Sequence, residues 1–184
     1  TTNNNLTDGI VTVALNDILV SGLTVSPTPA VVGTKVKITV TLKNKGNQNA
    51  TFTVSFYYDN TWIKNQTVTD MIPGPKGITD LTVTWDTEGV PLGLYIIKAK
   101  VPPLEGEFVV TDNERTAEVI LEQKMSDIEI TDVTADPTTV LRGKTVTITV
   151  TIKNKGNMDE TVSASVSYDT TLIETKTGIT LTMG

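Results

Sequence analysis

Hydrophobic and polar residues alternate along most of the chain, and the alternation is clearest in one stretch that occurs twice. Apolar residues occupy every second position from Val36 to Leu42, between lysines and threonines, and Asn-Lys-Gly-Asn follows at residues 44–47. The same pattern returns at residues 146–157, about 110 positions later. A period of two places one row of side chains in a core and the other in water. Each copy therefore predicts a half-buried antiparallel strand, followed by a sharp turn whose residues tolerate positive φ.

Alternating segments of this kind fill residues 17–122 and predict one complete domain. No helical periodicity interrupts them, and proline, glycine, asparagine and aspartate separate them. Trp62 and Trp85 are expected to pack within the sheets, with an exposed sugar contact as the alternative for Trp62. Tyr95, two residues after Gly93, is typical of a tyrosine corner whose hydroxyl bonds loop backbone. The pattern predicts an all-β, antiparallel Greek-key sandwich of the immunoglobulin type. Its seven expected strands are residues 17–25, 36–43, 51–58, 62–69, 78–85, 95–101 and 115–122.

Residues 127–184 repeat residues 17–74 without a gap, with about two positions in five identical. Counterparts of the last three strands of the first domain are absent from residues 127–184. The repeat therefore predicts an incomplete second sandwich made of its first four strands. Such a unit exposes an apolar face and unpaired strand edges, which invite pairing with another strand.

Residues 1–16 contain a further alternating stretch, which the same shift aligns with the last strand of the complete domain. It is expected to be a strand that belongs to a preceding repeat or is donated to a neighbouring subunit. Two explanations follow for the open second unit. The chain is a segment of a longer tandem array, or chains assemble head to tail by strand complementation. The first is favoured, because one donated strand replaces only one of three.

Composition narrows the choice of partners. The net charge is −6 with a pI near 4.6, and the absence of a basic stripe argues against nucleic acid and against anionic membrane surfaces. Cysteine and histidine are both absent, which excludes disulfides, thiol nucleophiles and the commonest general base. No apolar run in the sequence is long enough for a membrane span. Threonine makes up about a fifth of the residues, as expected for the solvent face of strands.

Candidate modification sites are three Asn-X-Thr triplets, which begin at Asn5, Asn49 and Asn65. This triplet is the acceptor pattern for N-glycosylation, although a chain rich in asparagine and threonine also produces it by chance. Asn49, on a turn, and Asn65, near a short strand, are expected to be exposed, and glycosylation is favoured more for an archaeal source than for any other.

Loop carboxylates are the remaining candidates for chemistry. Asp86 and Glu88 lie in one loop, and Asp112 and Glu114 lie in another. Their spacing differs from that of an EF-hand, and no carboxylate pair has a nucleophile and base beside it. We therefore expect no catalytic residue, no metal, no cofactor and no enzymatic activity.

Several motifs resemble the CARDB family, the cell-adhesion-related domain found in bacteria. They are Asp17-Ile-Leu-Val, Gly33 before the strand at 36–43, Lys43-Asn-Lys-Gly, Thr82-Val-Thr-Trp and Gly93-Leu-Tyr. The resemblance covers residues 17–122 entirely and residues 127–184 as a shortened copy. It implies sandwich modules related to immunoglobulin and fibronectin type III domains, in extracellular, cell-surface proteins of bacteria or archaea.

The expected function is that of a non-catalytic structural module in an extracellular surface repeat protein, such as a stalk, adhesin or filament. Its expected partners are neighbouring repeats or identical subunits, together with surface glycans or proteins. The alternative is an accessory module of a secreted hydrolase that binds its substrate or a polysaccharide.

Overall fold

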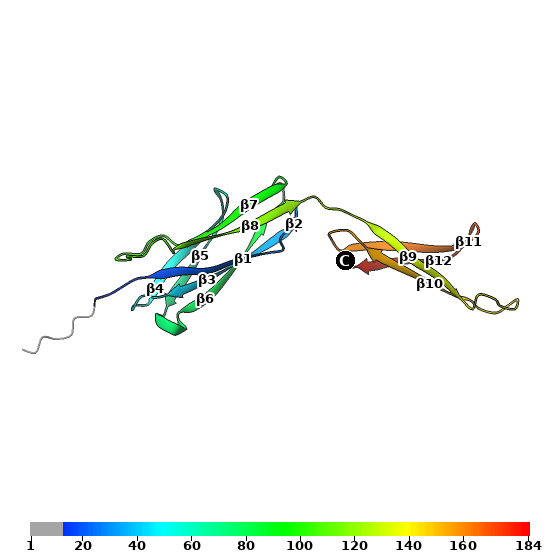
Figure 1. Ribbon diagram of the computed structural model, residues 1–184, viewed down its shortest axis with the longest axis horizontal. Helices are drawn as coiled ribbons and strands as arrows, with labels where there is room; N and C mark the ends of the chain where they lie inside the picture. The colour runs from blue at the N-terminus through cyan, green and yellow to red at the C-terminus, as the bar shows by residue number, and fades with distance from the viewer. Residues whose placement is uncertain (1–12) are drawn as a thin grey trace, which may run out of the picture. The chain divides into compact units, whose positions relative to one another are not determined.

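The computed structural model describes residues 13–184, and these residues form two compact units. We call them unit 1, described from residue 13 to residue 121, and unit 2 (Glu122–Gly184). The strand expected in residues 1–16 lies mostly outside the described residues, and residues 13–16 are not in a strand. Figure 1 labels the elements of each unit.

Unit 1 is an antiparallel sandwich of two sheets. One sheet has the order β1-β3-β6, and the other has the order β2-β8-β7-β4-β5. This arrangement confirms the expected all-β, immunoglobulin-like fold. The elements are β1 (Ile18–Ser26), β2 (Ala30–Val31), β3 (Lys35–Asn44), β4 (Ala50–Tyr58), β5 (Thr61–Met71), η1 (Gly74–Lys76), β6 (Ile78–Asp86), β7 (Gly93–Lys100) and β8 (Glu114–Glu122).

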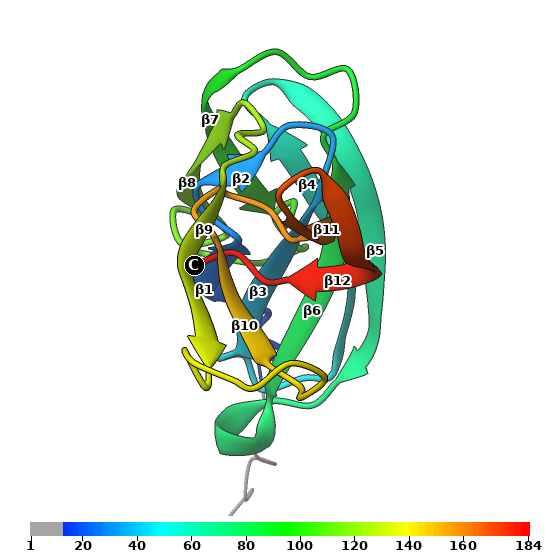
Figure 2. The ribbon, with the colours of Figure 1, turned by 90° about the vertical axis from the view of Figure 1, so that its right-hand side faces the viewer.

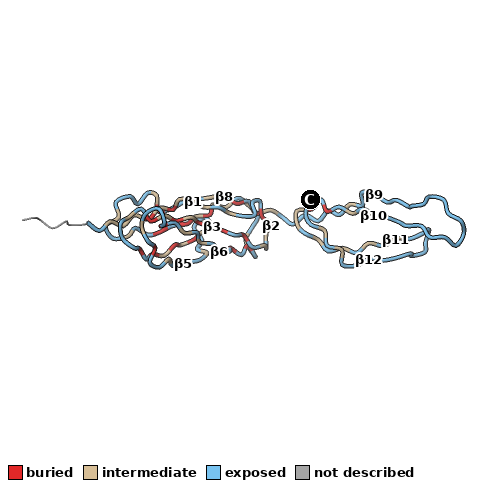
Figure 3. The backbone as a smooth tube through the Cα atoms, turned by 90° about the horizontal axis from the view of Figure 1, so that it is seen from below, coloured by how far each residue is buried: buried red, intermediate tan, exposed pale blue. Residues whose placement is uncertain are grey.

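Strand β3 is the centre of its sheet, as its alternating pattern indicates. It pairs with β1 on one side and β6 on the other, so that Val40 lies opposite Leu23 and Leu81. Its apolar row is fully buried, and most of the inward residues of β4, β7 and β8 are buried as well. Figure 3 shows buried segments concentrated in this unit. Burial of apolar area from both sheets is the main force that stabilises such a sandwich.

Aromatic residues close one side of this core. Trp85 is buried and stacks on Tyr58, with ring centroids 4.7 Å apart. The hydroxyl of Tyr95 donates to the carbonyl oxygen of Pro91 at 2.8 Å, which confirms the predicted tyrosine corner. The expectation for Trp62 is wrong, because this side chain is 57% exposed. It lies on β5, an edge strand that pairs only with β4, so the sheet provides nothing to cover it.

Two further strands differ from the sequence prediction. β2 is a two-residue strand that was not predicted, and it extends the second sheet beside β8. β5 is longer than the short strand expected, because it continues to Met71.

Unit 2 contains four strands in two separate antiparallel pairs, β9 with β10 and β11 with β12. Figure 2 shows the yellow β9–β10 pair and the orange to red β11–β12 pair. In both units the register of the first pair contains an irregularity. The strands are β9 (Ile128–Asp136), β10 (Thr147–Asn154), β11 (Glu160–Tyr168) and β12 (Thr171–Leu181).

Candidate functional site

The inner face of unit 2 is apolar but largely uncovered. Ile148 is 38% exposed, whereas its counterpart Ile38 in unit 1 is fully buried. Ile130 is 61% exposed, whereas its counterpart Val20 is 1% exposed. Figure 3 shows the same contrast, with most of unit 2 coloured as exposed. Equivalent side chains are therefore buried in unit 1 and largely exposed in unit 2. We call the surface of unit 2 that carries them the open face.

A cleft of about 600 Å³ runs along the open face, between β10 on one side and β11 and β12 on the other. In unit 1 the corresponding space is part of the packed core. The lining residues are Ile148, Thr149, Val150, Thr151, Ile152, Ala164, Val166, Glu174, Lys176, Ile179 and Leu181. The cleft combines branched apolar residues with two charged residues of β12, Glu174 and Lys176. This combination suits an added β-strand better than a small apolar ligand.

Strand edges are also free beside the open face. In unit 1, β3 pairs with β6, and β4 pairs with β7. Among the described residues of unit 2, β10 pairs only with β9, and β11 pairs only with β12. Each unpaired edge presents backbone N–H and C=O groups that can accept another strand.

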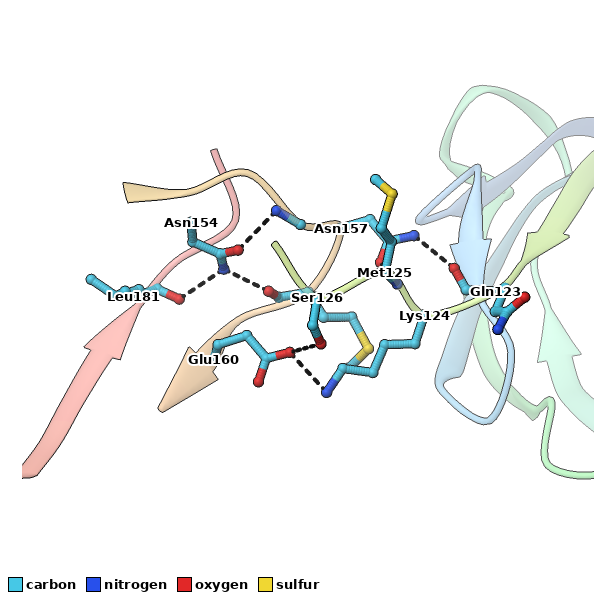
Figure 4. A network of polar contacts seen from close by, with 10 residues as sticks. Gln123, Lys124, Met125, Ser126, Asn154, Asn157, Glu160 and Leu181 are labelled. Atoms are coloured by element: carbon cyan, nitrogen blue, oxygen red, sulfur yellow. Dashed lines mark hydrogen bonds and ion pairs between the residues drawn. The ribbon is translucent and has the colours of Figure 1, made fainter. Parts of the chain in front are cut away.

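The repeated Asn-Lys-Gly-Asn turn fixes how the chain enters each unit. The side-chain nitrogen of Asn47 donates to the carbonyl oxygen of Val13, and its Oδ1 accepts from the backbone N–H of Leu15. Asn157 makes the same pair of bonds to Gln123 and Met125, and Figure 4 shows the bond to Gln123. In each unit the second asparagine of the turn thus clamps the segment that precedes the first strand.

The first asparagine of the turn closes the turn itself. Asn154 is buried, and its side-chain nitrogen donates to the carbonyl oxygens of Met158 and Leu181 (Figure 4). Its Oδ1 accepts from the N–H of Gly156. Asn44 makes the equivalent bonds in unit 1, so that the turn is also tied to the end of β5.

The expectation that this turn uses positive φ is wrong. Among the described residues, none in either copy of the turn has a positive φ. Glycine is required for another reason, because a Cβ on Gly46 would lie 2.3 Å from the carbonyl oxygen of Leu15. In unit 2 the same atom on Gly156 would lie 2.4 Å from the carbonyl oxygen of Met125. Positive φ occurs instead at Asp59 and Asp169, in the β4–β5 and β11–β12 hairpins.

Glu160 fastens the segment that leads into unit 2. Its Oε1 accepts from the hydroxyl of Ser126 at 2.6 Å and lies 2.9 Å from Nζ of Lys124 (Figure 4). These two interactions lower the pKa of Glu160, the hydroxyl first and the ammonium second. Because these groups are exposed, the contacts orient the segment more than they stabilise the unit.

A second polar site lies in unit 1, where the connection between β7 and β8 meets the start of β1. Glu107 accepts from the backbone N–H of Ile18 at 2.7 Å with Oε1. Its Oε2 accepts from the N–H of Leu104 at 2.8 Å and from the side-chain nitrogen of Asn113 at 2.9 Å. One carboxylate therefore joins this long connection to the first strand. We call Asp17, Glu107, Asp112 and Asn113 the loop cluster.

The carboxyl of Asp17 in the loop cluster has a raised pKa. Burial raises its pKa above the ordinary value of 3.8, and the carboxylates of Asp112 and Glu107 raise it further, while the ammonium of Lys45 acts in the opposite direction. Lys45 Nζ lies 3.4 Å from Oδ2 of Asp112. Asp112 was a candidate from the sequence, whereas Asp17 and Glu107, which are far apart in the chain, were not.

The predicted glycosylation residues differ in their surroundings. Asn49 is exposed, but its side-chain nitrogen donates to Oδ1 of Asp70 at 2.9 Å. Asn65 is exposed on β5, where its Oδ1 accepts from Nε1 of Trp62 at 3.0 Å. Asn5 lies outside the described residues. Glycosylation of these residues stays a prediction.

The other candidate carboxylates have structural surroundings. Asp86 accepts from the backbone N–H of Glu88 at 3.1 Å, and Glu114 pairs with Lys100 at 3.2 Å. In residues 13–184, no three histidine, cysteine, aspartate or glutamate side chains are grouped as a metal site would require. The described residues also contain no helix long and apolar enough to cross a membrane.

The two sheets, the tyrosine corner and the repeated strand order define an immunoglobulin-like β-sandwich module. Within that class, the model of the CARDB family matches residues 15–115, and the chain belongs to this family. CARDB is a non-catalytic domain family whose members occur in surface or secreted proteins. No curated protein matches the chain.

Solved structures include a CARDB domain of the PF1109 protein from Pyrococcus furiosus, crystallised in complex with di-metal ions. The sequence of this domain is 26% identical to that of the present chain. The match covers 60% of this chain and 97% of that chain, with a TM-score of 0.47. A β-glucosidase from Listeria innocua is 12% identical over 58% of this chain and 16% of that chain, with a TM-score of 0.41.

Proposed function

We propose that the chain is a structural module of an extracellular surface repeat protein, in which successive sandwiches form a stalk, adhesin or filament. The observation that carries the proposal is the open face of unit 2, since its strands repeat those of unit 1 and lack the neighbours that complete unit 1. Membership of a family found in surface or secreted proteins supports the location.

The mechanism that we propose is strand complementation. Strands equivalent to β6, β7 and β8 pair with the free edges of β10 and β11 and cover the open face. The register of β3 with β6 gives the expected alignment, in which the incoming strand runs antiparallel to β10. Backbone hydrogen bonds would supply affinity, and the alternating apolar row would supply specificity. The strands come from the same polypeptide or from an identical neighbour.

The test appends the missing strands to the chain. Gly74 and Gly184 occupy equivalent positions, so residues 75–122 of unit 1 are joined after Gly184. Unit 2 should then unfold cooperatively, with β10 amide protons protected from exchange. The matched control carries the same segment with Val83→Thr and Trp85→Thr, two changes that remove buried apolar side chains.

The proposal predicts protection with the native segment and little with the control. Equal protection with both segments, or none with either, would contradict it. Sedimentation of the 184-residue chain then separates the two sources of strands. Association that rises with concentration indicates supply by a neighbour, whereas a monomer at all concentrations indicates supply within one polypeptide.

A further inference from the structure

Three oxygen atoms of the loop cluster are buried without a hydrogen-bond donor from the protein. They are Oδ1 of Asp17, Oδ1 of Asp112 and Oδ1 of Asn113, and they come from segments almost a hundred residues apart in the chain. No other buried side-chain nitrogen or oxygen in residues 13–184 lacks a partner. Buried polar atoms are nearly always satisfied, so three orphans in one cluster need a common explanation.

Asn113 points most clearly to a ligand. It is 2% exposed, and its side-chain nitrogen is held by Oε2 of Glu107, a member of the same cluster. Its backbone carbonyl accepts from the N–H of Val101 at 2.8 Å. Because Asn113 is held through both its side-chain nitrogen and its backbone carbonyl, its Oδ1 stays in the cluster. A buried acceptor that receives no hydrogen bond costs free energy.

The charged side chains near the cluster form no hydrogen bond with Oδ1 of Asp17, Asp112 or Asn113. Both oxygens of Glu107 already accept from N–H donors, so this carboxylate positions the loop. Lys45 reaches Oδ2 of Asp112 and not its Oδ1. Lys45 also links the two aspartates, because its backbone N–H donates to the carbonyl oxygen of Asp17 at 2.8 Å while its ammonium lies 3.4 Å from Asp112.

We propose that Oδ1 of Asp17, Oδ1 of Asp112 and Oδ1 of Asn113 bind one divalent cation of the calcium class. Two carboxylates and an amide form an all-oxygen ligand set, which suits a hard cation, whereas structural zinc sites use sulfur and nitrogen. Water molecules complete the coordination. The ion joins the start of β1 to the end of the connection before β8, and its expected dissociation constant is about 10⁻⁴–10⁻³ M, as in extracellular modules.

The sequence did not predict this site, because Asp17 stands far from the loop carboxylates in the chain. Of the three carboxylates in the cluster, Glu107 is occupied by N–H donors, and Asp112 is paired with Lys45 through Oδ2. Unit 2 offers an internal comparison, since Asp127 is the counterpart of Asp17 but is exposed. The described part of unit 2 contains no equivalent of the connection between β7 and β8.

Calorimetric titration of the whole chain with calcium chloride tests the proposal. We expect one ion per chain, and in 10 mM calcium a rise of about 3 °C or more in the Tm of unit 1 over potassium chloride of equal ionic strength. Asp112→Asn and Asp17→Asn should each weaken binding at least about tenfold, as expected for loss of a charged ligand. The matched control Asp127→Asn should bind as the native chain does.

A second measurement does not depend on the variants folding. In amide NMR spectra of the native chain, calcium should shift the signals of residues 17, 112 and 113 and leave that of Asp127 in place. Absence of binding heat and of these shifts would overturn the proposal and leave water as the partner of the three oxygens. Equal weakening by Asp127→Asn would also overturn it, because it would indicate diffuse attraction to an acidic protein.

Discussion

Three residues of the Asn-Lys-Gly-Asn turn each have a different role. In unit 1, Asn44 closes the turn, Asn47 holds the incoming segment, and Gly46 lets the carbonyl oxygen of Leu15 approach. The same contacts recur in unit 2. The turn therefore joins the segment that enters a unit to the end of β5 in unit 1 and to the end of β12 in unit 2.

Gly46→Ala should reveal this junction. Its new Cβ would overlap the carbonyl oxygen of Leu15, so we expect the free energy of unfolding of unit 1 to fall by about 2 kcal/mol. Urea denaturation followed by tryptophan fluorescence measures the loss, since both tryptophans lie in unit 1.

Gly22→Ala is the matched control, because its Cβ would meet the side chain of Thr41 at an ordinary 3.4 Å. We expect a change of less than about 1 kcal/mol there. A Gly46 variant as stable as the Gly22 variant would show that the entering segment can move away at little cost.

Individual side chains were predictable from sequence where a local pattern determines them. The tyrosine corner needs Gly93 and Tyr95 close together, and the burial of Trp85 follows from its place in an alternating row. Trp62 was misjudged because its exposure depends on β5 being the edge of its sheet, which no local pattern reveals. Asp17 and Glu107 were missed for the same reason, since only the tertiary fold brings them together.

At the scale of elements, alternation identified seven strands of unit 1 and all four of unit 2. Valine, isoleucine and threonine dominate these segments, and their branched side chains favour extended backbone. β2 was not recognised because two residues are too few to show a period. The end of β5 was also missed, because polar residues such as Asp70 interrupt the alternation of apolar and polar residues near the end of the strand.

The same substitution on equivalent strands should lower the free energy of unfolding by different amounts in the two units. Ile38→Ala on β3 should lower the free energy of unfolding of unit 1 by about 3 kcal/mol, because it leaves a cavity in a closed core. Ile148→Ala on β10 should cost unit 2 less than about 1 kcal/mol, since the side chain is already partly in water.

Urea titrations that follow amide signals of each unit separately measure both values. The two substitutions are chemically identical and occupy equivalent positions, so each controls for the other. Similar losses in the two units would mean that the open face is covered in solution by something other than solvent.

At the scale of the whole molecule, the sequence predicted the fold class and the repeat more fully than any site. The alternation within each strand and the repeat of residues 17–74 in residues 127–184 can both be recognised in a single sequence. Binding surfaces arise where strands are unpaired or where distant loops meet, and these depend on the assembled fold. The open face was an exception, because it follows from counting the strands of the second copy.

Hydrogen–deuterium exchange on the dilute, native chain tests most directly that unit 2 is an unfinished copy of unit 1. Each strand of an antiparallel sheet directs alternate amides to its two neighbours. Along β3 both sets should exchange slowly, because β1 and β6 flank it. Along β10 the set that faces β9 should be slower than the set that faces the free edge. Equally slow exchange of both β10 sets, matching β3, would contradict the account.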